Sequence, residues 1–104
     1  MKTKAVSELS PAELDWVVGI IGGIYKRESV MPFVNWFKPS TNWAQGGPII
    51  EREKISVEPY KGSEGMWLAV HGEHYAYGDT PLVAAIRAYV QSKMGDEIQV
   101  PEVA

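Results

Sequence analysis

Two histidines and a glutamate stand together in the segment His71-Gly72-Glu73-His74, and these residue types can bind a divalent metal. The segment also carries a turn signal between two β-favouring runs. Side chains that straddle a tight turn need not face the same side of a sheet, and no further ligand stands at a recognisable spacing. We therefore expect no metal and no cofactor, and interpret His71 and His74 as solvent-facing turn residues.

Glu51 and Glu53 lie two positions apart beside Arg52, and paired carboxylates can divide the roles of general acid and general base. On a helix, however, side chains two positions apart diverge by about 200°. A solvated helix face is the simpler interpretation. Together with His71 and His74, these glutamates define the least favoured hypothesis, a small metal-dependent enzyme.

Nucleophiles and phosphate-binding loops have no recognisable pattern in the chain. It contains no cysteine, which excludes disulfides, thiolate metal sites and a cysteine nucleophile. Ser29, Ser56 and Ser92 lack the context of a nucleophile elbow. Gly46-Gly47-Pro48 could offer amides to an anion, but no Gly-Lys-Ser/Thr follows, and close packing against Trp43 or another aromatic is preferred. We predict no catalytic residue and lean towards a protein that is not an enzyme.

Aromatic side chains supply the candidate interaction surface, for which we select Trp36, Trp43, Tyr75 and Tyr77. Such rings can stack nucleobases, but a nucleic-acid binder also needs a concentrated basic surface. The chain has ten Lys and Arg against thirteen Asp and Glu, a formal net charge of −3, and the basic residues are scattered. Core packing and a patch for a protein partner are the better interpretation, with nucleic acid left open as an alternative.

Two helices that could position these residues are marked by their caps. In the first, Ser10, Pro11 and Glu13 have the spacing of an N-cap, a first helical residue and a capping box, and apolar residues follow at helical spacing to about Gly22. In the last, Thr80 and Pro81 have the same N-terminal spacing, and Gly95 is the residue at which we expect the helix to end.

The middle of the chain is less regular. Ile24 to Ser40 is predicted to be a long, partly buried connection held by its aromatics. A short or kinked helix is expected over about Asn42 to Glu53, capped by Ser40 or Thr41, although Gly46, Gly47 and Pro48 oppose an uninterrupted one. Pro48 could instead open a separate turn.

Strands are expected at Ile55–Glu58, Met66–Val70 and His74–Tyr77, and the last two form a hairpin. The acidic segment from Asp96 to Ala104 contains Pro101 and is predicted to be a mobile or edge-lying tail. The fold class is therefore α+β: a small antiparallel sheet of two or three strands packed with an N-terminal helix, a short middle helix and a C-terminal helix. Helices on one face or on both satisfy this pattern.

Size and composition indicate one globular domain over residues 1–104, since 45% of the residues are hydrophobic and 22% are charged. Neither a signal peptide nor an apolar run that approaches a bilayer span is visible. We expect a cytoplasmic monomer or small homo-oligomer that does not bind membranes.

Three strings of residues are distinctive: PSTNWAQGGPIIERE at 39–53, TPLVAAIR at 80–87, and GDE at 95–97 before Pro101. They resemble the NinX-like family of bacteriophage proteins, and the opening residues 1–16 are similar to the start of that family. The segment between Gly22 and Pro39 carries no such likeness. More distantly, the Pro-Ser-Thr pattern before the middle helix resembles small phage α/β/α sandwich domains.

The resemblance implies an accessory protein of a tailed phage or prophage, made in the cytoplasm of the bacterial host. It implies no activity, so no site residue is transferred. Our leading hypothesis is a non-enzymatic module that binds an unknown host or phage protein. The alternative is a nucleic-acid-associated protein, because the order of elements is superficially similar to that of double-stranded RNA-binding domains.

Overall fold

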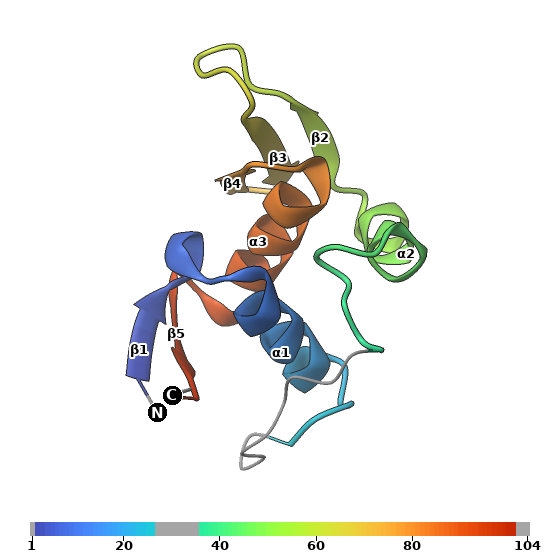
Figure 1. Ribbon diagram of the computed structural model, residues 1–104, viewed down its shortest axis with the longest axis vertical. Helices are drawn as coiled ribbons and strands as arrows, with labels where there is room; N and C mark the ends of the chain where they lie inside the picture. Colours follow the sequence, from blue (N-terminus) through green and yellow to red (C-terminus); the bar gives the residue numbers. More distant parts are fainter. Residues whose placement is uncertain (1, 27–35, 102–104) are drawn as a thin grey trace.

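A computed structural model describes residues 2–26 and 36–101 of the chain (Figure 1). The chain forms two antiparallel sheets, one of two strands and one of three, around a long C-terminal helix. The elements in chain order are β1 (Lys2–Ala5), the 3₁₀ helix η1 (Val6–Glu8), α1 (Pro11–Ile21), α2 (Trp43–Glu53), β2 (Ser56–Pro59), β3 (Trp67–His71), β4 (His74–Gly78), α3 (Pro81–Met94) and β5 (Glu97–Val100). The α+β class and the antiparallel pairing are confirmed.

Helix α1 begins where its capping signals predict. The Ser10 Oγ accepts a hydrogen bond from the Glu13 amide at 3.2 Å, and the Glu13 carboxylate accepts one from the Ser10 amide at 2.9 Å. This reciprocal pair is the capping box. Leu9 and Leu14 on either side of the cap are fully buried, and Gly22 ends the helix.

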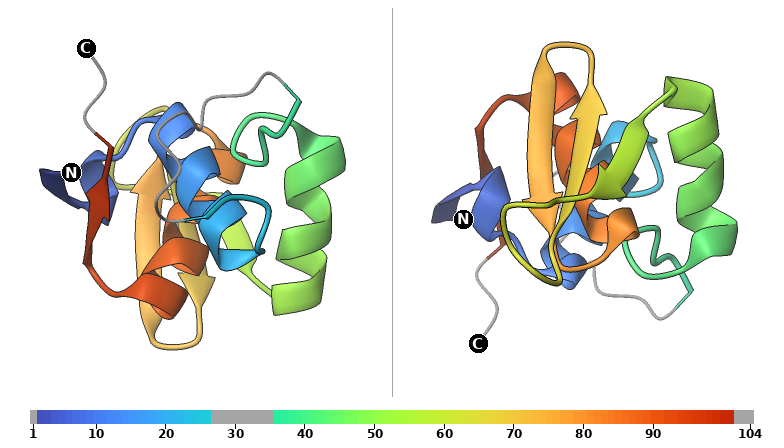
Figure 2. Two further views of the ribbon diagram at one scale, coloured as in Figure 1. Left: turned by 90° about the horizontal axis from the view of Figure 1, so that it is seen from below. Right: turned by 90° about the horizontal axis from the view of Figure 1, so that it is seen from above.

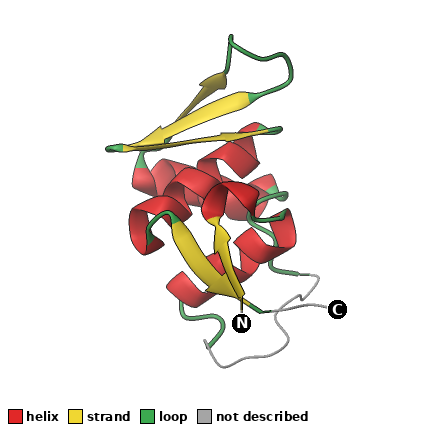
Figure 3. Ribbon diagram, turned by 90° about the vertical axis from the view of Figure 1, so that its left-hand side faces the viewer, coloured by secondary structure: helices red, strands yellow, loops and turns green. Residues whose placement is uncertain are grey.

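Helix α3 is the central element and packs against the three-stranded sheet (Figure 3). Its start is also as predicted, because the Thr80 Oγ1 accepts from the Val83 amide at 3.1 Å and Pro81 occupies the first turn. The helix lies very close to β4: a methyl group on Gly78 would stand 2.6 Å from the Ala84 nitrogen. Only glycine permits this approach of sheet and helix.

Helix α2 is continuous from Trp43 to Glu53, with Pro48 inside it. The prediction that Ser40 or Thr41 caps this helix is wrong, because the Asn42 side chain accepts from the Ala44 amide. Pro48 is tolerated because the carbonyl that it leaves unpaired belongs to Ala44, an exposed residue on which water can replace the lost donor.

The three-stranded sheet has the order β2-β3-β4 and an unbroken antiparallel register. Ala69 and Ala76 are buried on the face that α3 covers, whereas their neighbours Val70 and Tyr75 are exposed on the other face. Among the described elements, helices cover only the first face (Figure 3). An α/β/α sandwich would need a second helical layer on the open one.

The segment from Asp96 to Ala104, predicted to be a mobile or edge-lying tail, contains a strand. Residues Glu97–Val100 form β5, which pairs antiparallel with β1 at the other end of the chain. Ile98 and Val100 are 6% and 0% exposed, so burial of these side chains fixes the segment. Residues 102–104 lie outside the described part.

The connection between α1 and α2 is anchored to α1 just before Asn42. The Asp15 carboxylate accepts a hydrogen bond of 2.8 Å from the Ser40 amide, and the Ser40 hydroxyl donates to the Pro11 carbonyl at 3.1 Å. Both side chains are buried. The rest of the predicted long connection, residues 27–35, lies outside the described residues.

Candidate interaction surface

The open face of the three-stranded sheet carries a cluster of large side chains. In the antiparallel register, Tyr75 lies opposite Val70 and Tyr77 lies opposite Leu68, so these four side chains share one face. Tyr75 is 59% exposed, Val70 38% and Tyr77 37%. The strand alternation that buries Ala69 and Ala76 therefore presents these side chains to solvent.

A third tyrosine extends this cluster from the loop after β2. The Tyr60 ring meets the Tyr77 ring edge to face, with centroids 4.9 Å apart, and Tyr75 meets Tyr77 in the same manner at 6.0 Å. Partial desolvation, followed by the proximity of Tyr60 and Tyr75, raises the pKa of Tyr77 above its usual value. We call Tyr60, Leu68, Val70, Tyr75 and Tyr77 the aromatic face.

The two tryptophans selected from the sequence lie elsewhere. Trp43 is 57% exposed in the first turn of α2. Trp36 is 61% exposed, packs edge to face on Phe37, and its carbonyl accepts a hydrogen bond from the Gln45 side chain. The structure therefore joins Tyr75 to Tyr77 on the sheet and places Trp36 and Trp43 around α2.

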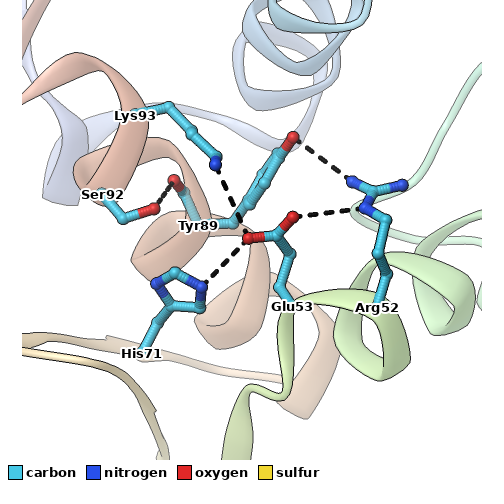
Figure 4. A network of polar contacts seen from close by, with 6 residues as sticks. All are labelled: Arg52, Glu53, His71, Tyr89, Ser92 and Lys93. Atoms are coloured by element: carbon cyan, nitrogen blue, oxygen red, sulfur yellow. Dashed lines mark hydrogen bonds and ion pairs between the residues drawn. The ribbon is translucent and has the colours of Figure 1, made fainter.

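A polar cluster, centred on Glu53, lies where α2, β3 and α3 meet (Figure 4). One Glu53 oxygen is 3.1 Å from the His71 Nε2 and 3.7 Å from the Lys93 Nζ, while the other accepts from the Arg52 Nε at 3.2 Å. Arg52 also donates to the Tyr89 hydroxyl at 3.4 Å. The carboxylate thus links the C-terminal ends of three elements.

The surroundings of Glu53 favour a structural carboxylate. Partial desolvation acts to raise its pKa, but the Arg52 hydrogen bond, the Lys93 charge and the His71 hydrogen bond together lower it. A carboxylate that is ionised at neutral pH and engaged at both oxygens is poorly suited to act as a general acid. The cluster therefore connects α2, β3 and α3 through one carboxylate.

The sequence interpretation of the two histidines needs correction. His71 and His74 are directly opposite in the hairpin, so both lie on the face that α3 covers, and neither is fully exposed. His71 contacts Glu53, whereas His74 lines a groove beside β4. Glu51 is exposed on α2. Within residues 2–26 and 36–101, no three His, Asp or Glu side chains gather at a spacing that could hold a metal ion.

The close packing predicted for the glycines of α2 is present at Gly46, but its partner is not an aromatic side chain. A methyl group on Gly46 would stand 2.2 Å from the Pro39 carbonyl oxygen and 2.6 Å from the Leu82 Cδ1, so Gly46 packs against backbone and a leucine rather than an aromatic. At Gly47 the nearest atom, on Trp43, would be 3.9 Å away.

Three members of the aromatic face, Tyr60, Leu68 and Val70, were not selected from the sequence. Alternation alone could have assigned Leu68 and Val70, because both fall out of phase with Ala69 on β3. Tyr60 gives no such signal, because it follows the end of β2. Its ring contacts Tyr77 only because the folded sheet brings β2 and β4 close together.

The described residues thus form a small α+β protein in which the three-stranded sheet has one face covered by helices and one open aromatic face. The family model described as Bacteriophage P22, NinX matches residues 5–93, and the chain belongs to this family. The match includes the segment between Gly22 and Pro39, for which no resemblance was expected, and it ends before the Gly95-Asp96-Glu97 string. A comparison with curated proteins found no match.

No helix in the described part of the chain combines the length and the apolar character needed to cross a membrane. The family assignment indicates an accessory protein of a bacteriophage or prophage.

Proposed function

We propose that this phage accessory protein is a non-enzymatic module that binds another protein, of host or phage origin, in the bacterial cytoplasm. The observation that supports the proposal is the aromatic face. Three tyrosines and two aliphatic residues are together on one face of a sheet, and tyrosine is enriched at the energetic centres of protein interfaces.

The charges around the sheet favour a protein over a nucleic acid. Glu58 lies on the open face opposite Leu68, and Glu73 occupies the hairpin turn. Arg87, on the other side of the sheet, already donates to the carbonyls of Tyr77 and Leu9. Lys61, which follows Tyr60, is exposed, but a lysine between the exposed Glu58 and Glu64 is not the concentrated basic surface that a phosphate backbone needs.

The test is affinity purification from infected bacteria, followed by binding measurements with the purified captured protein. Tyr75→Ala and Tyr77→Ala should each weaken binding by about tenfold or more, as truncation of an interfacial tyrosine does. Trp43→Ala is the matched control, because Trp43 is 57% exposed against 59% for Tyr75 but lies on α2.

Unchanged affinity of both tyrosine variants would overturn the assignment to the aromatic face. A loss of affinity in the Trp43 variant alone would move the site to α2. Salt-sensitive shifts of DNA or RNA, without a protein partner, would favour the nucleic-acid alternative.

A further inference from the structure

The outer edge of β4 is not paired with another strand among the described elements. The hairpin turn consists of Gly72 and Glu73, with Gly72 at a φ of +61°, and the pair His71 and His74 closes it. Since hydrogen-bonded and non-bonded pairs alternate along an antiparallel ladder, the amides and carbonyls of Tyr75 and Tyr77 point away from β3.

One contact verifies this direction. The Tyr77 carbonyl accepts a hydrogen bond of 2.9 Å from the Arg87 Nη1, which lies on α3 and outside the β3–β4 ladder. Across the described residues, no backbone group of another element bonds to the amide or carbonyl of Tyr75. Natural edges are commonly protected by proline, lysine or a bulge, and β4 has none of these, whereas β2 ends in Pro59.

A groove runs along this edge. It has a volume of about 780 Å³ and lies between β4 and the segment that leads into β5, with a floor on α3. Figure 2 shows the β1–β5 ribbon on the side of β4 opposite to β3. The groove therefore offers an extended chain a place beside β4.

The charge of the groove is acidic. Glu73, Asp96 and Glu97 line it and are exposed, while the guanidinium of Arg87 is engaged by the carbonyls of Tyr77 and Leu9. A second copy of β4 would bring the same three carboxylates to the edge, and like charges oppose such pairing. A segment with lysine or arginine side chains complements them.

We propose that the β4 edge binds an extended basic segment of the partner protein by strand addition, with the amide and carbonyl of Tyr75 and the amide of Tyr77 supplying the main-chain hydrogen bonds. This inference rests on the proposed function and names the partner's chemistry. Side chains of an added strand alternate between two faces. One set would extend the aromatic face and the other would meet the carboxylates of the groove, so the segment alternates apolar and basic residues.

The probe is a ten-residue peptide of alternating Lys and Val, and the observable is the shift of the Tyr77 amide resonance, which every variant retains. Tyr75→Pro removes the outward amide without removing a β3–β4 hydrogen bond, and proline is tolerated at such an edge position. Tyr75→Ala removes the same ring but keeps the amide. We expect Tyr75→Pro to bind the peptide about tenfold more weakly than Tyr75→Ala, which corresponds to one lost main-chain contact.

Two further measurements keep the test independent of how Tyr75→Pro folds. A peptide methylated on alternate backbone nitrogens should lose binding to the unaltered protein, and Asp96→Asn with Glu97→Gln should weaken binding of the unmethylated peptide. Equal affinity of the methylated and unmethylated peptides would overturn strand addition. Dimerisation of the protein through β4, or a Glu-Val peptide that binds as tightly as the Lys-Val peptide, would overturn the proposal of a basic segment. These outcomes leave the aromatic-face result with the captured protein unaffected, so the two proposals can fail separately.

Discussion

Replacing Gly46 by alanine should destabilise the protein, although alanine is the better helix former. Its methyl group would stand 2.2 Å from the Pro39 carbonyl oxygen. The Leu82 side chain could move, but this carbonyl cannot, because the adjoining Ser40 is held by Asp15 and Pro11. Overpacking against fixed backbone costs about 3 kcal/mol, and the helix propensity of alanine offsets about 1 kcal/mol. The net loss is about 2 kcal/mol.

The neighbouring Gly47 supplies a matched control in the same helix. The nearest atom to an added methyl group would be 3.9 Å away, which is ordinary van der Waals contact. Gly47→Ala should therefore stabilise the protein by about 1 kcal/mol through helix propensity alone. Two identical substitutions at adjacent positions of α2 are thus expected to change stability in opposite directions.

Urea denaturation followed by tryptophan fluorescence measures both variants. The midpoints should move in opposite directions with unchanged slopes, and Gly46→Ala should lower the melting temperature by about 8–16 °C. If Gly46→Ala were as stable as Gly47→Ala, the close packing of α2 on Pro39 would be refuted.

Three further predictions concern buried or paired groups. Asp15→Ala, which leaves the Ser40 amide without its acceptor, should cost about 1–3 kcal/mol, whereas Asp15→Asn keeps an acceptor. Desolvation raises the pKa of Asp15 in the folded protein, although the Ser40 hydrogen bonds oppose this shift. The wild type should therefore lose stability relative to Asp15→Asn as the pH rises from the unfolded pKa through the folded pKa, and urea denaturation across this pH range measures the difference. If the carboxyl were not desolvated, the free energies of unfolding of the two proteins would change in parallel with pH. The pKa of Glu53 is lowered in the folded protein. The wild type should therefore have a free energy of unfolding about 1 kcal/mol higher than that of Glu53→Gln above the unfolded pKa, and this difference should disappear as the pH falls through the folded pKa. Val100→Ala should lower the free energy of unfolding by about 2 kcal/mol in thermal unfolding, whereas the exposed control Gln99→Ala should lower it by less than about 0.5 kcal/mol. If neither substitution changed the stability, β5 would not be packed on the core.

The two principal helices could be predicted because their signals are local. Ser10 with Glu13, and Thr80 with Pro81, satisfy amides within one turn of the same helix, so a few neighbouring residues determine where each helix begins. The β3–β4 hairpin is equally local, since a two-residue turn with glycine sets its register.

The candidate surface could be predicted in part. The side chains of Tyr75 and Tyr77 share a face because they stand two apart in one strand, and their selection required no knowledge of the fold. Trp43 falls within the segment Asn42 to Glu53 that was predicted to be helical, so the sequence already separated it from the sheet. Nothing in the sequence indicated that the Trp36 carbonyl would accept a hydrogen bond from Gln45 of α2. The contribution of Tyr60 depends on how the loop after β2 returns to the sheet.

The amino-acid sequence by itself determined the elements that depend on neighbouring residues: the capped helices, the hairpin and the alternation that exposes tyrosines. Tertiary structure alone decided that Glu97–Val100 pairs with Lys2–Ala5, that Ser40 binds Asp15 instead of capping α2, and that His71 meets Glu53. These contacts join segments far apart in the chain. A residue pattern indicates the local preferences of each segment. The free energy of a contact between distant segments arises from the burial of side chains, which exists only in the folded protein.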